Sequence, residues 1–124
     1  MGPDTSLEVL VAGGFILDQG GLEDCGIPFP DAKGVYANLV AVNPSGAGAN
    51  FLTLYPFESD PPTVSSINYA PGTAALANGI FVPICDHTGP NDCFWDLVIY
   101  NGPSASVDVI LDLTGYVAES TPIL

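Results

Sequence analysis

Apolar and polar residues alternate along most of this chain, and no long segment has the period of an amphipathic helix. A period of two places neighbouring side chains on opposite faces of a β-strand. The alternation is clearest in residues 107–113, where Asp108 and Asp112 fall on one face and four apolar residues fall on the other. The pattern predicts strands at residues 7–11, 15–17, 35–42, 51–55, 64–69, 79–84, 94–100 and 107–113.

Turn-forming residues separate these segments. The 124 residues include 14 glycines and 12 prolines, spread along the chain, and Asn-Pro-Ser-Gly at 43–46 is typical of a turn. Only residues 73–78 have a helical composition, and this stretch is too short for a stable helix. We therefore expect an all-β fold, a single β-sandwich or jelly-roll-like domain of about eight or nine strands. This domain is expected to span residues 12–118, after an N-terminal lead at 1–11 and before a tail at 119–124.

Acidic residues outnumber basic ones by 14 to 1, which gives the chain a formal net charge of -13. A surface that binds nucleic acid needs several Lys or Arg residues, and anionic bilayers repel an acidic chain, so the composition excludes both partners. Membrane insertion is not expected, because no apolar run reaches the ~18 residues that cross a bilayer. The first residues also lack the basic and apolar regions of a signal peptide. Acidic residues on strands are expected to be solvated and to keep sheet edges from aggregating.

Two of the three cysteines are spaced for a disulfide. Cys85 and Cys93 flank a polar loop that a hairpin-closing bond can bridge. The alternatives are two reduced thiols or, less favoured, a zinc site, which His87 alone cannot complete. Cys25 is left over and is expected either to bond to another chain or to be a buried free thiol. Because disulfides are typical of exported proteins, the cysteines favour an extracellular or cell-surface location.

No group of residues in the sequence indicates an active site, so we expect no enzymatic activity. His87 lies in a polar loop and is expected to be solvated, because a Cys-His dyad would need a lowered thiol pKa and an oxyanion hole. Asp108 and Asp112 lie about 13 Å apart along one strand face, which is too far for a glycosidase pair.

A calcium ion is the most plausible metal for this chain. Oxygen ligands from loops suit Ca²⁺, and the candidates are Asp86, Asn91, Asp92 and Asp96. Their spacing matches no EF-hand, and we expect no other cofactor.

Trp95 and Tyr100 could form a platform for a sugar ring. Alternation places Trp95 on the same face as Leu97 and Ile99, however, and this favours a position for Trp95 in the core. A sugar site here is therefore the weaker interpretation.

Several phrases occur in an order that resembles a known module. They are Cys25-Gly26-Ile27-Pro28, Asn43-Pro44-Ser45-Gly46-Ala47-Gly48, Phe51-Leu52-Thr53-Leu54-Tyr55-Pro56, Ser66-Ile67-Asn68-Tyr69-Ala70-Pro71-Gly72, Ile99-Tyr100-Asn101-Gly102 and Val109-Ile110-Leu111-Asp112-Leu113-Thr114-Gly115-Tyr116-Val117. Together they resemble a β-rich module, often in tandem copies, of secreted and surface proteins of actinobacteria and other bacteria, and the likeness spans residues 12–118. The resemblance implies a non-catalytic unit that accompanies cell-wall hydrolases and other exported proteins.

The chain departs from that module in two places. Upstream of Val11 it has no counterpart of the Arg-Leu-Leu-Asp-Thr-Arg-like phrase that opens a full module, and its loop between Cys85 and Cys93 is longer. The opening strand of the module is therefore expected to be absent or to come from another source.

The segment at residues 7–11 is the candidate for contacts between molecules. Its apolar residues Leu7, Val9, Leu10 and Val11 could add as a strand to the sheet edge of another copy; the alternative is pairing within its own sheet. We expect a non-catalytic extracellular structural protein, a subunit of a surface layer or fibre that assembles by strand exchange into a homo-oligomer or polymer. The alternative is an accessory module that binds carbohydrate or cell-wall polysaccharide.

Overall fold

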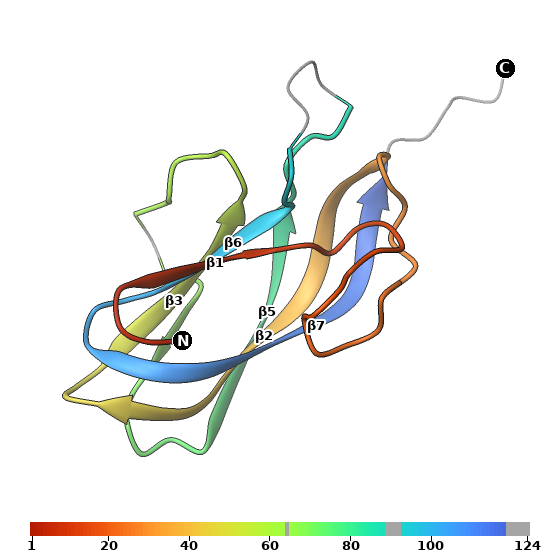
Figure 1. The fold of residues 1–124 in the computed structure, drawn as a ribbon. Coiled ribbons are helices and arrows are strands. Elements are labelled where there is room, and N and C mark those ends of the chain that lie inside the picture. The colour runs from red at the N-terminus through yellow and green to blue at the C-terminus, as the bar shows by residue number, and fades with distance from the viewer. Residues whose placement is uncertain (64, 89–92, 119–124) are drawn as a thin grey trace, which may run out of the picture.

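The structure is a computed structural model that describes residues 1–63, 65–88 and 93–118. Within these residues it is all-β, with two antiparallel sheets that form a sandwich (Figure 1). One sheet has the order β1-β6-β3-β4 and the other β5-β2-β7. The strands are β1 (Thr5–Val9), β2 (Ala32–Gly46), β3 (Asn50–Pro56), β4 (Ile67–Tyr69), β5 (Ala75–Pro83), β6 (Leu97–Asn101) and β7 (Ala105–Ala118).

The all-β prediction is confirmed, although the described residues form seven strands rather than eight or nine. The predicted strand at residues 15–17 is wrong. Ile16 alone is buried there, and the side chain of Phe15 is 84% exposed, so the segment gains too little from packing to join a sheet. It lies instead in a long connection between β1 and β2.

One further local prediction is overridden by sheet pairing. Residues 43–46 do not end β2, because a bulge after Val42, with Asn43 in the left-handed region, lets the strand continue to Gly46. A Cβ at Gly46 would lie 2.6 Å from the Ala105 backbone, so only glycine fits there. Residues 75–78, which have a helical composition but are too short for a helix, belong to β5 and pair with β2.

The core lies between the two sheets. Its largest fully buried apolar side chains are Leu39, Leu52, Leu97, Val11 and Val35. At one end of this core a polar cluster joins β3, β4 and β6, because the Asn50 amide donates to the Tyr69 hydroxyl at 2.9 Å and that hydroxyl donates to Asn101. Burial raises the pKa of the Tyr69 phenol. No described helix is long and apolar enough to cross a bilayer.

Candidate functional site

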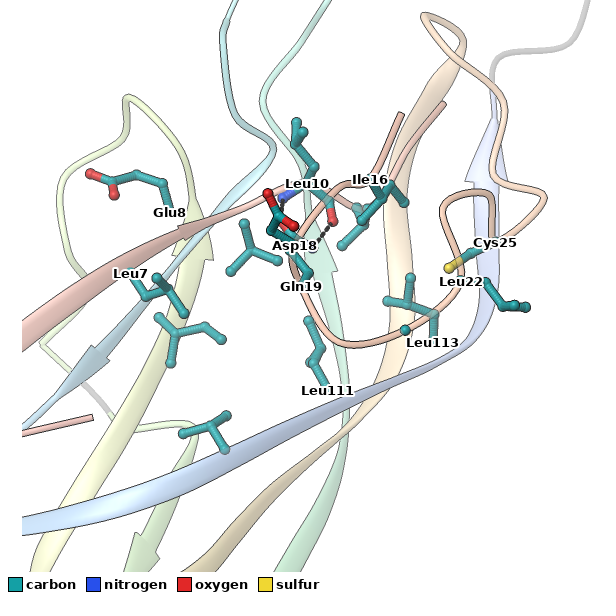
Figure 2. Close-up of a pocket in the computed structure, with 15 residues that line it drawn as sticks. Leu7, Glu8, Leu10, Ile16, Asp18, Gln19, Leu22, Cys25, Leu111 and Leu113 are labelled. Atoms are coloured by element: carbon teal, nitrogen blue, oxygen red, sulfur yellow. Dashed lines mark hydrogen bonds between the residues drawn. The ribbon is translucent and has the colours of Figure 1, made fainter. Parts of the chain in front are cut away.

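An apolar groove opens on the side of the sandwich where the edge strands β1 and β7 face each other (Figure 2). Its volume is about 310 Å³. The apolar lining comes from both sheets and from the connection after β1, and includes Ile16, Leu22, Ile99, Val109, Leu111 and Leu113. The charged residues that line it are Glu8 and Asp18, both acidic.

The floor of the groove is the inner face of β7. Val107 is buried in the core, and Val109, Leu111 and Leu113 continue the same face but are only partly buried. These three side chains pack against the core on one side and line the groove on the other. The apolar surface of the core therefore extends into the groove, where a bound molecule could bury more of it.

The outer edge of β7 has a strand-like partner at one point only among the described residues. The Met1 amino group donates to the Val107 carbonyl at 2.6 Å, and the Val107 N–H donates to the Met1 carbonyl at 3.0 Å. This exchange of two bonds is the hydrogen-bonded pair of an antiparallel ladder. The backbone groups of Val109, Leu111 and Leu113 alternate outward in the same direction, and residues 1–63, 65–88 and 93–118 supply no backbone partner for them there.

The outer edge of β1 is occupied by a side chain at its end. The Leu10 N–H donates to the Gln19 side-chain oxygen, and the Gln19 side-chain nitrogen donates to the Leu10 carbonyl, both at 2.8 Å (Figure 2). The primary amide thus makes the two bonds that a neighbouring strand would make. The edge of β7 and the end of β1, which border the groove, therefore each have one strand-like pair of hydrogen bonds that does not continue along the strand.

The predicted assembly strand lies within its own chain. Residues 5–9 pair with β6, from Thr5 opposite Asn101 to Val9 opposite Leu97. All four apolar residues of the predicted assembly strand line the groove, and Val9 and Val11 are buried there whereas Leu7 is exposed. The structure therefore shows β1 paired within its own sheet, which was the alternative to strand exchange between copies. The sheet edge that is open beside the groove is that of β7.

Cys25 also lines the groove, and its side chain is exposed. This position contradicts the interpretation of Cys25 as a buried thiol. Its thiol lies near Leu22 and Leu113 (Figure 2), within reach of a molecule in the groove.

The Cys85–Cys93 disulfide is present as predicted, with 6.3 Å between the Cα atoms. It joins the segment after β5 to the segment before β6. The two sulfurs and a Glu58 carboxylate oxygen lie within 4.8 Å of one another. Because the sulfurs are bonded to each other, they are not available as thiolate ligands for zinc.

His87 is buried rather than solvated, with only 3% of its side chain exposed. Its Nε2 contacts Asp96 Oδ1, and its ring lies 4.8 Å from the Phe29 ring. The other Asp96 oxygen accepts hydrogen bonds from the Val11 and Ala12 amides at 2.7 and 2.9 Å. The prediction failed because the polar composition of the loop gives no sign that Asp96, which lies just before β6, is a buried partner for the imidazole.

The predicted calcium cluster does not form from its described members. Asp96 is buried, and both of its oxygens are engaged by His87 and backbone amides. Asp86 lies at the surface, where Lys33 Nζ is 3.0 Å from its carboxylate. Hydrogen bonds from Thr88, and then from Lys33, lower the pKa of Asp86. Asn91 and Asp92 lie outside the described residues.

Trp95 and Tyr100, the predicted sugar platform, differ in their surroundings. Trp95 precedes β6 and remains partly exposed, so it is not the core residue that alternation favoured. The Tyr100 hydroxyl donates to Asp4 at 2.7 Å, which raises the pKa of the phenol.

Sequence reasoning missed a second aromatic pair. Tyr36 and Phe81 lie opposite each other on β2 and β5, with 4.8 Å between their ring centroids, and each is 48% exposed. Alternation around Tyr36 signals its outward position, but its neighbour on another strand cannot be found without the register.

No family model, curated protein or solved structure matches this chain. The resemblance to the surface-protein module thus rests on the phrases in the sequence alone.

Proposed function

We propose that this chain is a non-catalytic structural protein of the cell exterior, a subunit of a surface layer or fibre that binds an extended strand of a neighbouring polypeptide in the groove. The observation that carries the proposal is the apolar groove between two sheet edges, each of which has one strand-like bond pair that does not continue. An added strand would supply backbone hydrogen bonds to an edge, and every second side chain would fill the groove.

The surroundings of the groove support a binding role. Leu7 and Leu22 on its walls are largely exposed, and Phe15 and Phe29 nearby in the same connection are exposed as well. Contiguous exposed apolar surface on a small protein usually marks an interaction site. By contrast, the buried polar groups His87 and Asp96 are engaged with each other and with the backbone, which favours a structural role for them.

The extracellular part of the proposal is supported by the disulfide, since such bonds persist mainly in oxidising compartments. The shortage of Lys and Arg fits the same location, because Lys33 is the one residue at which a trypsin-like protease could cut.

An uncharged strand peptide tests the acceptor function directly. We expect a labelled peptide of alternating Val and Thr to bind the intact protein saturably in a fluorescence-anisotropy titration. Val109→Pro removes an outward N–H without removing a bond to β2, because proline is tolerated on an edge with its nitrogen toward solvent. Val109→Thr is the reference variant, since it keeps the N–H and the size of the side chain while replacing one methyl group that lines the groove by a hydroxyl.

Peptide binding should be about tenfold or more weaker in Val109→Pro than in Val109→Thr, a difference equivalent to about one backbone hydrogen bond. Absence of binding to the wild-type protein would refute the acceptor function. Equal binding by both variants would refute its location at the β7 edge.

A second candidate function is polysaccharide binding by the outer face of the β5-β2-β7 sheet. The Phe81 ring lies over Gly34, where a Cβ would be 2.5 Å from it, and Tyr36 lies over Gly115. The glycines let both rings lie along the sheet beside the exposed Asn38. Aromatic faces with nearby hydrogen-bonding groups suit a sugar ring.

Pull-down on chitin, cellulose and peptidoglycan tests this second candidate. Binding should be lost in Tyr36→Ala and Phe81→Ala and kept in Trp95→Ala. Loss in Trp95→Ala alone would return the site to the platform predicted from the sequence, and binding to none of the polymers would refute the function.

A further inference from the structure

The chemistry of the strand that fits the groove can be read from β7, and this inference rests on the proposed function. The antiparallel pair between Met1 and Val107 fixes the register of any strand that continues along this edge from the position of Met1. Residues directly opposite each other in an antiparallel pair share a face. Side chains opposite Val109, Leu111 and Leu113 would therefore enter the groove, and those opposite residues 108, 110 and 112 would face solvent.

The solvent-facing positions of β7 are acidic at both ends of this stretch. Asp108 and Asp112 are exposed and flank Ile110. Across residues 1–63, 65–88 and 93–118 neither carboxylate has a hydrogen bond or an ion pair, and the one Lys of the chain, Lys33, lies at Asp86. Opposite charges on directly facing strand positions attract, and like charges repel.

A second copy of this chain fits these positions poorly. Its net charge is -13, and it contains one Lys and no Arg that could face Asp108 and Asp112. We propose that the β7 edge takes an antiparallel segment of a different polypeptide, with apolar residues opposite Val109, Leu111 and Leu113 and with Lys or Arg opposite Asp108 and Asp112. The partner is thus a cationic amphipathic strand.

A fusion in cis tests this register on the intact chain. Six residues placed directly before Met1 are positioned to lie opposite residues 113 to 108, so Val-Lys-Val-Thr-Val-Lys puts valines toward the groove and lysines opposite Asp112 and Asp108. Matched extensions carry Thr or Glu in place of both lysines. The fusion gives the strand a high effective concentration, so a weak contact is measurable.

Thermal unfolding should give the highest midpoint for the Lys extension, a lower one for Thr and the lowest for Glu. Asp108→Asn with Asp112→Asn should remove the differences among the three, and salt should reduce them, because exposed charge pairs are screened. An order that is unchanged in the double variant would overturn the assignment of the two aspartates.

If a fusion does not fold, binding of the same three sequences as free peptides to the intact protein tests the same register. At low salt the Lys peptide should bind about tenfold or more tightly than the Glu peptide, the ratio expected from two facing charge pairs. Equal binding of the Thr and Lys peptides would overturn the cationic partner and leave the acceptor function standing. Binding of neither would overturn both.

Sedimentation velocity of the protein alone distinguishes a second copy as the occupant. The wild-type chain should remain monomeric as its concentration and the salt concentration rise. Concentration-dependent association that is lost in Val109→Pro and kept in Val109→Thr would show that copies occupy each other's grooves, which would overturn the cationic partner.

Discussion

Replacing Asp96 by alanine removes one buried carboxylate that serves two backbone amides and an imidazole. Val11 and Ala12 donate to one of its oxygens, and His87 contacts the other. Leaving a buried polar group without a partner costs ~1–3 kcal/mol, and breaking a buried pair by removing one member costs ~3–5 kcal/mol. Water that enters the space left by the side chain can satisfy some of these groups. We therefore expect Asp96→Ala to lower the free energy of unfolding by about 3–5 kcal/mol.

Urea unfolding followed by the fluorescence of Trp95, which is next to Asp96 and is the single tryptophan, measures this loss. With a slope of ~2 kcal/mol per molar urea, the midpoint should fall by about 2 M. Asp96→Asn keeps the shape and can still accept from the two amides, so it should cost ~1–2 kcal/mol. Asp112→Ala is the exposed control and should change stability by less than ~0.5 kcal/mol.

The outcome also bears on the groove. Val11 follows β1 and lines the groove, so a chain that loses the Asp96 bonds should bind a strand peptide more weakly than its remaining folded fraction predicts. A loss in Asp96→Ala no larger than in Asp112→Ala would refute the view that this carboxylate fixes the end of β1.

Three more predictions concern the stability of the fold. Gly102→Ala should lower it by ~1–3 kcal/mol in urea unfolding, because its Cβ would lie 2.4 Å from Asn50 Oδ1, whereas Gly48→Ala, with open space around it, should have little effect; similar losses in both would refute the steric argument. Reducing the Cys85–Cys93 bond should lower the free energy of unfolding by about 2–3 kcal/mol. Reductant should therefore lower the unfolding midpoint of the wild type but not that of a chain with both Cys85→Ser and Cys93→Ser. An equal shift in both chains would show that the effect has another cause. Since the folded-state pKa of Asp86 is lowered, its contribution to stability is present above the ordinary pKa of about 3.9 and is lost as pH falls toward the folded-state value. The melting temperature of the wild type should accordingly fall more between pH 4 and pH 2 than that of Asp86→Asn, and parallel curves would contradict this link.

The parts of the fold that could be predicted from the sequence are those in which one strand carries its own signal. In β7 the alternation of Val109, Leu111 and Leu113 with two aspartates identifies both faces without knowledge of any neighbour. The Cys85–Cys93 bond was accessible for a similar reason, because the spacing of the two residues is local. The failures at 15–17 and 43–46 occur where pairing or burial elsewhere outweighs a local preference.

The groove could not be predicted, since it depends on which strands are edges. Alternation shows that Leu7 and Leu111 are apolar positions on strands, but not that β1 and β7 lie at the same side of two different sheets. The buried pair of His87 and Asp96 was missed for a related reason. His87 lies within the loop that the disulfide closes and Asp96 lies beyond it, and only the tertiary fold brings the Val11 and Ala12 amides to the carboxylate.

Asp108 and Asp112 on the open edge of β7 affect both its tendency to pair with another copy and the kind of strand that it can bind. A long edge strand with unpaired backbone groups pairs readily with another edge, and charged side chains are a common way to prevent this. In two copies brought together along β7, each edge would present Asp108 and Asp112 to a partner that has only acidic and neutral side chains on the same strand. The repulsion that keeps copies apart becomes attraction for a strand with lysines or arginines at the facing positions, because specificity depends on the difference between the two free energies. On the proposed function, the apolar face of β7 remains open to a cationic strand while the acidic face disfavours another molecule of the same protein.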